Sequence, residues 1–407
     1  MNRMKWSRYN TQWQGDQDTL VTYNSLNHKI LYGLKEDYKS DKSVEQLCLD
    51  GFLVEDQLDE VQLLKEMLEL RNQDTNSLSC WVFVSNDCNL TCPYCWEQEG
   101  LLKKGSNMSM ENAKKTVDWL ILRKNVRMAE ELSVTFMGGE PLLNMEAIWF
   151  IAQQLNQKIP KVTYDIITNG VLLTPNVVEK CMEINLHSYQ ITLDGTKNLH
   201  DSRRCFADGE GTFDVILKNV ENLVAMDENV SLVIRMNIDM QNYKNIPILL
   251  RLLRRMEFHR FAALCINDTI LKDSKQNNFI LKEVIHILRL AKDLGFHIAY
   301  GELNHCWMMS ESWFMINQDG LIYKCPSLVG EKEYAVGSIK EAELFKEYQR
   351  QISQKPWDTC LSCELAGLCS GGCPNRDKIQ EAQGRSGKVC RKQYLMELLK
   401  LKYVPKS

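Results

Sequence analysis

From about residue 80 onward, short apolar runs alternate with amphipathic segments along the chain. The runs that predict strands are residues 81–84, 132–136, 164–168, 188–193, 232–238 and 260–266. Helical periodicity lies between them, for example at residues 110–126, 144–157 and 175–184. This alternation predicts an α/β fold with parallel strands and right-handed crossovers. Six such units favour a partial (β/α)6 barrel, similar to a TIM barrel, over a small doubly wound sheet. Site residues are then expected just after the carboxyl ends of the strands.

The pattern changes at both ends of the chain. Residues 19–24 and 28–32 predict short strands, residues 44–50 and 55–71 predict helices, and residues 72–77 form a polar break. After about residue 300 the periodicity fades, cysteines become frequent, and residues 391–402 predict a last helix. We therefore expect three domains, at residues 1–77, 78–300 and 301–407.

Composition narrows the class of protein. The 407 residues are 25% charged and 44% hydrophobic, as in ordinary soluble proteins. A net charge of -4 argues against a nucleic-acid partner. The polar first 23 residues and the lack of a long apolar stretch predict a cytoplasmic protein without a membrane span. Because that compartment keeps thiols reduced, the 15 cysteines indicate metal binding or catalysis.

Three cysteines follow the first predicted strand of the alternating region. Cys88, Cys92 and Cys95 lie on one short loop. Three thiolates can hold a four-iron cluster by three of its irons and leave the fourth open. An open iron can bind and reduce a small molecule, so this loop predicts a redox catalyst.

Polar loops follow the next three predicted strands. Residues 137–141 read Met-Gly-Gly-Glu-Pro, in which the glycines allow close approach of a ligand and the carboxylate can accept from an ammonium group. A plain strand-to-helix turn is the alternative. Asn169, Thr192 and Asp194 follow on the same predicted rim and suit the hydroxyl and amine groups of a nucleoside.

The cysteine spacing, with Tyr94 before the last cysteine and residues 138–141 after the second strand, resembles the radical S-adenosylmethionine (SAM) superfamily. In that family the amino and carboxylate groups of SAM chelate the open iron, and an electron cleaves SAM to methionine and a 5'-deoxyadenosyl radical. The resemblance implies that Gly138, Gly139 and Glu140 contact the methionyl ammonium of SAM. It also implies that Thr192 and Asp194 lie near the ribose and that Tyr94 borders the adenine. Many relatives carry serine where Thr192 stands.

A basic segment supplies the expected partner of the SAM carboxylate. Residues 200–204 read His-Asp-Ser-Arg-Arg and resemble a His-Asp-x-x-Arg segment of one branch of the family. Arg204 is the preferred candidate for that carboxylate, ahead of Arg235.

The downstream cysteines resemble the SPASM domain of peptide-modifying radical SAM enzymes. The matching positions are Cys306, Gly320, Cys325, Cys360, Cys363, Cys369, Cys373 and Cys390. The resemblance implies two auxiliary [4Fe–4S] clusters, hence three in all. Cys360, Cys363, Cys369 and Cys390 would ligate the outer one, and Cys306, Cys325 and Cys373 the inner one. Zinc is the alternative metal for paired cysteines.

The inner cluster lacks one protein ligand in this count. His305 or Cys265 could supply it, or the iron could be open to a substrate thiolate, which favours thioether formation. The other cysteines, Cys48, Cys80, Cys181, Cys205 and Cys265, lack ligand spacing and are expected to be small buried residues. Cys205, beside Arg204, could instead donate a hydrogen atom in epimerisation.

The first 77 residues resemble winged-helix-like modules that capture leader peptides at a sheet edge; a structural cap on the barrel is the alternative. Together these resemblances imply a maturase of a ribosomally made precursor peptide, of the ranthipeptide or sactipeptide type. It is expected to form a thioether from a cysteine and to take electrons from flavodoxin or ferredoxin.

Several alternatives remain open. They are carbon-carbon cross-linking, epimerisation, formylglycine formation as in sulfatase maturation, and a non-catalytic iron-sulfur carrier or sensor. Sulfatase-type relatives carry an aspartate after the second SPASM cysteine, whereas Pro326 and Ser327 follow Cys325 here.

Overall fold

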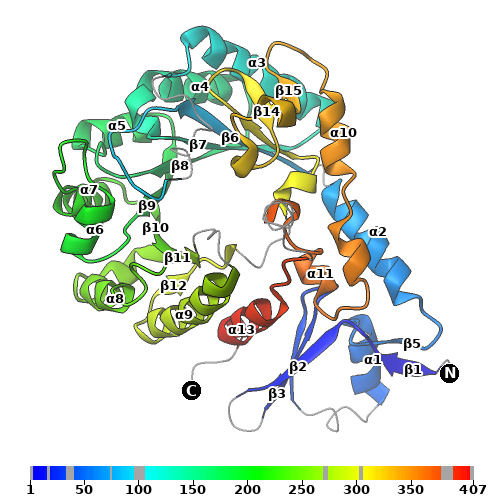
Figure 1. Cartoon of the computed structure of the whole chain (residues 1–407). Coiled ribbons are helices and arrows are strands. Elements are labelled where there is room, and N and C mark those ends of the chain that lie inside the picture. Colours follow the sequence, from blue (N-terminus) through cyan, green and yellow to red (C-terminus); the bar gives the residue numbers. More distant parts are fainter. Residues whose placement is uncertain are drawn as a thin grey trace. The chain divides into compact units, whose positions relative to one another are not determined.

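The computed structural model describes residues 3–15, 19–33, 41–73, 76–95, 106–268, 274–301, 306–376 and 388–403. The chain divides into two compact units (Figure 1). The smaller unit consists of Met1–Gln73, Tyr300–Ser310 and Ser353–Ser407, and the larger of Asp74–Ala299 and Glu311–Ile352. The division into three domains at residues 77 and 300 stays a prediction.

A ten-stranded sheet forms the core of the larger unit. Its six central strands are β6 (Ser77–Ser85), β7 (Glu131–Gly138), β8 (Val162–Thr168), β9 (Leu186–Thr192), β10 (Ser231–Ile238) and β11 (Ala262–Asp268). Each pairs in parallel with the next along the chain. The strand order does not reverse within this series, as it would in a doubly wound sheet. The predicted strands and their parallel pairing are confirmed.

Helices connect these strands and lie outside the arc that the strands form in Figure 1. They are α3 (Met110–Arg127), α4 (Met145–Lys158), α5 (Pro175–Glu183), α6 (Lys197–Arg203), α7 (Phe213–Met226), α8 (Ile246–Arg255) and α9 (Ser274–Asp293), with the 3-10 turns η3 (Pro141–Asn144) and η4 (Phe258–Arg260). Local chemistry sets the ends of α3. The Ser109 side chain accepts from the backbone N–H of Asn112, and Met128 adopts a left-handed conformation at the C-cap.

Short strands extend both edges of the sheet. They are β12 (His297–Ile298) beside β11, and β13 (Trp313–Ile316), β14 (Leu321–Tyr323) and β15 (Gly337–Ser338) beyond β6. The 3-10 turns η7 (Pro326–Leu328) and η8 (Lys332–Tyr334) and the helix α10 (Lys346–Ile352) complete this part. An apolar cluster joins β13 to the sheet, and its buried members are Phe83, Met137, Trp313, Met315, Tyr323, Val329 and Ala335.

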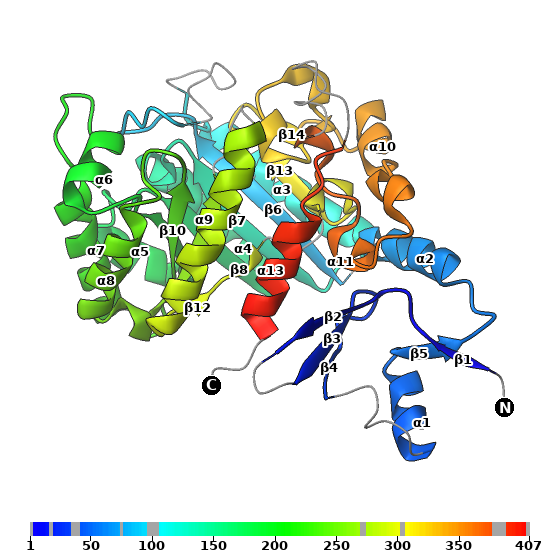
Figure 2. The ribbon, with the colours of Figure 1, turned by 60° about the horizontal axis from the view of Figure 1, so that its bottom comes forward.

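The smaller unit contains two small sheets. Strands β2 (Asn10–Gln14), β3 (Leu20–Asn24) and β4 (Ile30–Tyr32) form one, and β1 (Met4–Trp6) and β5 (Leu53–Glu55) form the other. Its helices are α1 (Asp41–Leu49), α2 (Glu60–Asn72), α11 (Ala366–Cys369) and α13 (Lys392–Tyr403), with 3-10 turns η6 (Trp307–Met309) and η9 (Pro356–Cys360). Figure 2 shows these elements from a second direction.

The predicted helix at residues 55–71 begins later in the structure. The Asp59 side chain accepts hydrogen bonds from the backbone N–H groups of Val61 and Gln62, which starts α2 at Glu60. Glu55, where the predicted helix would begin, pairs instead with Met4 of β1, 51 positions earlier in the chain. Such non-local pairing overrides helical periodicity.

The core of the smaller unit joins segments that are far apart in sequence. Its buried members are Tyr9, Leu26, Leu64, Leu68, Met309, Trp357 and Ala366. The Arg71 guanidinium donates to the carbonyl of Gly367 at 2.9 Å. A Cβ at Gly367 would lie 2.3 Å from the carbonyl oxygen of Ser25, so only glycine allows this approach. The amino-terminal segment and residues 353–403 therefore share one core.

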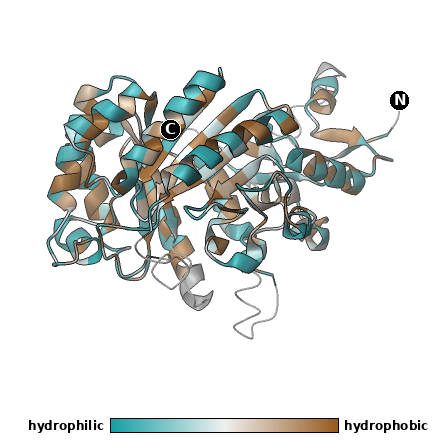
Figure 3. Cartoon of the chain, turned by 90° about the horizontal axis from the view of Figure 1, so that it is seen from above, coloured by the Kyte–Doolittle hydropathy of each residue, from teal (hydrophilic) through white to brown (hydrophobic). Residues whose placement is uncertain are grey.

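Hydrophobic and polar residues alternate on the helices, as Figure 3 shows. Among the described residues, no helix combines the length and the apolar character that crossing a bilayer requires.

Candidate active site

The three cysteines after β6 lie on one loop whose described part ends at Cys95. The loop closes on itself, since the N–H of Cys95 donates to the carbonyl of Cys92 at 3.1 Å. Burial raises the pKa of Cys88 to about 12, and Glu140 and the nearby thiols of Cys92 and Cys95 add to this shift. None of the three forms a disulfide. Three thiols on one loop, of which Cys88 interacts with the other two, are a donor set that fits an iron-sulfur cluster.

Hydrogen-bond donors reach the sulfur of Cys88 from two directions. The N–H of Leu90 lies 3.4 Å from it, and the side-chain amide of Asn169 lies 3.9 Å from it. Such donors stabilise a thiolate and tune the potential of a cluster that it ligates. Among the described residues, no three His, Cys, Asp or Glu side chains surround a single ion position. The ligands of a cluster bind different irons and do not converge on one such point.

The loop at residues 138–140 packs against the start of the cysteine loop. The N–H groups of Gly139 and Glu140 donate to the carbonyls of Ser85 and Asp87 at 2.9 and 2.7 Å. A Cβ at Gly138 would lie 1.9 Å from the oxygen of Ser85, and one at Gly139 would lie 2.4 Å from that of Asp87. The two glycines thus allow close approach of one backbone to another, a role that the sequence analysis missed.

Glu140 joins the ends of β7 and β8. Its fully buried carboxylate accepts from the Thr168 hydroxyl and the Asn169 N–H, both at 2.7 Å, and from the Leu142 N–H at 3.1 Å. Burial raises the pKa of this carboxyl, and the three hydrogen bonds act in the opposite direction. The carboxylate therefore fixes the position of Asn169 relative to the loop at residues 138–140.

Asn169 in turn contacts the cysteine loop. Its side-chain amide donates to the Asn89 side chain at 2.7 Å, while its side-chain oxygen accepts from the N–H of Val171 at 2.9 Å. The structure thus brings the predicted residues of three successive strand ends into one hydrogen-bonded network. Thr192, the last residue of β9, is also buried.

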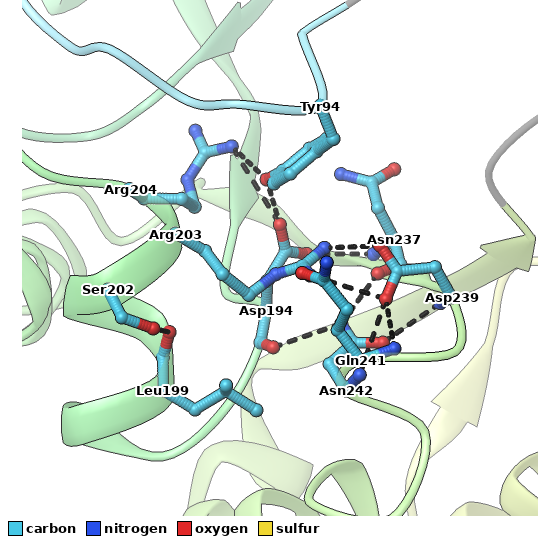
Figure 4. Close-up of polar contacts among 10 residues, drawn as sticks. All are labelled: Tyr94, Asp194, Leu199, Ser202, Arg203, Arg204, Asn237, Asp239, Gln241 and Asn242. Atoms are coloured by element: carbon cyan, nitrogen blue, oxygen red, sulfur yellow. Dashed lines mark hydrogen bonds and ion pairs between the residues drawn. The ribbon is translucent and has the colours of Figure 1, made fainter.

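Tyr94, Asp194 and Arg204 form a second group at this end of the sheet (Figure 4). The Tyr94 hydroxyl donates to the carboxylate of Asp194 and accepts from Arg204 Nη1 at 2.7 Å. Asp194 is fully buried, and its other oxygen accepts from the N–H of Asn237 at 2.8 Å. Although burial opposes it, nearby Tyr94, Cys92 and Asp194 hold the pKa of Arg204 above its usual value. Arg204 therefore stays charged beside the cysteine loop.

A hydrogen-bonded relay positions Arg204 and Asp194. The N–H of Asp194 donates to His200 Nδ1 at 3.4 Å, which leaves the ring proton on Nε2. That nitrogen lies 3.1 Å from the hydroxyl of Thr212, which donates to the carbonyl of Arg204 at 2.6 Å. Burial, together with nearby Arg204 and Arg203, lowers the pKa of His200 to about 3, so the ring is neutral.

Arg203 is a residue that the sequence analysis did not select. It forms a two-bond ion pair with Asp239, at 2.7 and 3.2 Å, and its guanidinium lies 4.5 Å from the centre of the Tyr94 ring. Figure 4 shows this pair below Tyr94. In the sequence, Arg203 is marked only by its place in the basic segment at residues 200–204. Its partner Asp239 lies 36 positions away, so the ion pair leaves no local pattern.

The smaller unit holds six of the seven downstream cysteines. Burial raises the pKa of Cys369, and the thiols of Cys360, Cys390 and Cys363 also act on it in that direction. The four predicted ligands of the outer cluster are thus brought together. Cys306 packs against the apolar core of the same unit.

The remaining predicted ligand positions are divided between the two units. Cys373 belongs to the smaller unit and Cys325 to the larger one. His305 lies outside the described residues. Cys265 lies on β11, where Arg235 Nη1 approaches its sulfur at 3.7 Å. The ligand set of the inner cluster stays a prediction.

The cysteines without ligand spacing differ in burial. Cys80, Cys181 and Cys265 are buried, as expected, whereas Cys48 and Cys205 are partly exposed. The carbonyl of Cys205 accepts from the N–H of Thr91 at 3.0 Å, and its sulfur lies 3.7 Å from the Thr91 hydroxyl. Cys205 therefore borders the cysteine loop.

Comparisons with known proteins agree with this arrangement. Residues 82–253 match the model of the Radical SAM superfamily. The radical SAM cyclopropyl synthase TigE of Paramaledivibacter caminithermalis is 25% identical over 319 residues, which cover 71% of this chain and 66% of TigE. A cysteine-type anaerobic sulfatase-maturating enzyme of Clostridium novyi is 25% identical over 71% of this chain and 85% of its own.

Solved structures share the fold. The structure of native anSMEcpe with bound AdoMet superposes with a TM-score of 0.64 at 18% identity, over 80% of this chain and 97% of that chain. Streptococcus suis SuiB bound to precursor peptide SuiA gives a TM-score of 0.54 at 15% identity, over 96% of this chain and 99% of that chain. The chain thus contains a radical SAM domain at residues 82–253, and together with its maturase relatives this domain identifies it as a radical SAM enzyme.

Proposed function

We propose that this enzyme cleaves SAM reductively and uses the resulting 5'-deoxyadenosyl radical to modify a ribosomally made precursor peptide. The observation that carries this proposal is the hydrogen-bonded network that joins the cysteine loop to Glu140 and Asn169. That network places a three-thiol donor set beside polar groups at successive strand ends. A reduced cluster, when bound, supplies the electron for radical formation.

The residues around the cluster have distinct proposed roles. Cys88, Cys92 and Cys95 hold three irons. Gly138, Gly139 and Glu140 meet the methionyl ammonium, and Arg204 meets the SAM carboxylate. Asn169, Thr192 and Asp194 lie near the ribose, and Tyr94 borders the adenine. The buried Asp194 and the charged Arg204 support these roles, because each is already oriented by protein hydrogen bonds.

The peptide substrate is supported by relatives and by the smaller unit. The solved structure of SuiB holds a precursor peptide, and anSMEcpe has been solved with peptides. In the described part of the chain, β2 and β4 each pair with β3 alone. Such edges can accept an added strand, so residues 1–77 are the proposed leader-binding module.

Thioether formation is the proposed reaction. It joins the sulfur of a substrate cysteine to a substrate carbon: the radical takes one hydrogen atom from that carbon, and the thiol proton goes to solvent. An auxiliary cluster held by the downstream cysteines would accept the remaining electron. Residues 301–407 are proposed to be a SPASM domain with two such clusters. The grouped cysteines around Cys369 support the outer one. A cytoplasmic flavodoxin or ferredoxin is the proposed electron donor.

Formylglycine formation is a second candidate, favoured by the sulfatase-maturating relatives. Pro326, which follows Cys325 and begins η7, stands where those enzymes carry an aspartate. Epimerisation is favoured by Cys205, which lies against Thr91 of the cysteine loop. The mass of the peptide product separates these reactions, because thioether formation removes two hydrogens and epimerisation leaves the mass unchanged.

The proposal is tested with anaerobically reconstituted protein and a chemical reductant. Wild-type protein should release 5'-deoxyadenosine from SAM and hold close to twelve irons per chain, as three four-iron clusters require. Changing Cys88, Cys92 and Cys95 together to alanine should abolish 5'-deoxyadenosine and remove about four irons. Cys48→Ala, which changes a cysteine without ligand spacing, should leave both unchanged. Wild-type protein that holds iron but never cleaves SAM would instead be a carrier or sensor.

A further inference from the structure

Three arginines lie at the carboxyl-terminal end of the parallel sheet, and they differ in their partners. Arg203 pairs with Asp239 at 2.7 Å. Arg204 lies 3.9 Å from Asp194 and donates to Tyr94. Arg235 contacts neutral acceptors alone among the described residues: its Nε donates to the Asn237 side chain at 2.9 Å, and its Nη1 approaches the sulfur of Cys265. Of these three described arginines, Arg235 is the one without a carboxylate partner.

Arg235 lies on the less covered face of β10. Buried residues alternate along this strand with partly exposed ones, and Arg235 and Asn237 belong to the partly exposed set. In register, Arg235 lies beside Thr192 of β9 and Cys265 of β11. The guanidinium thus stands among uncharged side chains near the carboxyl ends of three adjacent strands. It offers a planar pair of N–H donors, the geometry that binds a carboxylate through two hydrogen bonds.

The contacts of Arg235 separate it from the proposed position of the SAM carboxylate. A carboxylate that chelates the open iron must lie close to the cysteine loop. Arg204 acts electrostatically on Cys92, whereas both side-chain contacts of Arg235 are on β10 and β11. Yet Arg235 adjoins the proposed SAM site, because its partner Asn237 donates its backbone N–H to Asp194. A group bound by Arg235 would lie next to the nucleoside end of SAM.

We propose that Arg235 binds a carboxylate of the substrate, either an acidic side chain or a chain terminus, and so orients the peptide toward the site of radical formation. This inference rests on the proposed function. It adds a requirement for a negative charge in the substrate near the residue that is modified. Asn237 holds the guanidinium in place, and Cys265 and Asn267 form the neighbouring wall on β11.

The test uses reconstituted full-length protein and two probes, acetyl-Gly-Glu-Gly-amide and acetyl-Gly-Gln-Gly-amide, which differ in one carboxylate. Saturation-transfer NMR titrations with SAM present give the affinity of each probe, and equilibrium dialysis gives the affinity for SAM. Wild-type protein should prefer the glutamate probe by about tenfold, or about 1.4 kcal/mol. Arg235→Gln should lose this preference and keep its SAM affinity within about twofold. The control Arg251→Gln removes an exposed arginine that donates within its own helix and should change neither.

Two results would overturn the inference. One is an equal preference in wild-type protein and Arg235→Gln, including no preference in either. The other is a tenfold loss of SAM affinity in Arg235→Gln with the preference intact, which would assign Arg235 to the SAM carboxylate. If Arg235→Gln does not fold, Arg235→Lys replaces it in the test. Lysine lacks the two-donor fork of arginine, so Arg235→Lys should prefer the glutamate probe less than wild-type protein does. An unchanged preference for the glutamate probe refutes the inference. Release of 5'-deoxyadenosine by the wild-type protein, assayed separately, tests the proposed function itself.

Discussion

The cysteine loop at residues 88–95 and the cysteines at residues 360–390 are held in place in contrasting ways. The first is fixed by the carboxyl ends of parallel strands through Glu140, Asn169 and close backbone contacts. The second lies on short helices and turns, η9 and α11, that pack on an apolar core. Regular strand order thus supplies one thiol set with a rigid frame. The other depends on tertiary packing of irregular segments, so the two should respond differently to substitution.

The largest effect is expected from Gly138→Ala. Its Cβ would meet the carbonyl oxygen of Ser85 at 1.9 Å, and its φ of 146° already disfavours a side chain. Strain and forced displacement together should lower the free energy of unfolding by about 3 kcal/mol or more. Because the displaced segment begins the cysteine loop, release of 5'-deoxyadenosine should be lost. Urea unfolding and the SAM cleavage assay measure the two effects.

Two control substitutions sharpen this comparison. Gly209 has a φ of 88° but nothing within 4 Å of its added Cβ, so Gly209→Ala should cost only about 1 kcal/mol and retain SAM cleavage. Gly367→Ala, which would meet Ser25 of the smaller unit, should disturb the downstream cysteines while the cysteine loop still binds iron. Equal loss of SAM cleavage in Gly209→Ala and Gly138→Ala would contradict the role given to the Ser85 contact.

The sequence could predict the parallel sheet because its signal is local. The six apolar runs match β6 to β11, and the helical segments match α3, α4 and α5 within a few residues. The edge strands β12 to β15 were missed because they are two to four residues long, too short for a period to show. Strands β1 and β5 were missed because they depend on each other across the chain.

The residues of the candidate site could be predicted from the sequence, but the contacts among them could not. Motif spacing selected Tyr94, Asp194 and Arg204, yet it gave no sign that Tyr94 binds the other two side chains, which lie 100 and 110 positions away. The glycines at 138 and 139 were expected to admit a ligand, and their close contact with Ser85 and Asp87 follows only from the packing of two loops. Sequence patterns report residue types, whereas the partners of buried polar groups are set by the folded chain.

A smaller effect, dependent on pH, is expected from the relay through His200. In the folded protein the pKa of His200 is lowered to about 3, below the ordinary value of 6.5 for histidine. Between these values the unfolded chain binds a proton that the folded protein does not, so stability should fall as pH decreases, by at most about 1.4 kcal/mol per unit from this group. His200→Gln removes the titrating ring and should flatten this dependence while weakening the hold on Arg204.

Urea unfolding of both proteins at pH 7, 6 and 5 measures the effect. His259→Gln, which replaces a partly exposed histidine whose ring contacts Arg254, provides the matched control because it leaves the relay intact. A pH dependence in His200→Gln equal to that of wild-type protein would show that His200 is not the group that resists protonation.

The smallest effect is expected beside the cysteines of the smaller unit. Lys392 pairs with Glu364 at 2.7 Å, and it is partly exposed, so Lys392→Gln should change the free energy of unfolding by less than about 1 kcal/mol. Its ammonium also acts on the thiols of Cys363 and Cys390.

Removing this cation beside the proposed cluster ligands disfavours the reduced state of the cluster. The reduction potential of the proposed outer cluster should therefore become more negative in Lys392→Gln. Redox titration followed by electron paramagnetic resonance measures it. Lys400→Gln, which breaks a similar pair on the same helix, should leave the potential unchanged. Equal reduction potentials in Lys392→Gln and Lys400→Gln would argue that the thiols near Lys392 do not hold a cluster. The proposed cluster at residues 88–95 would then be the redox centre that the titration detects.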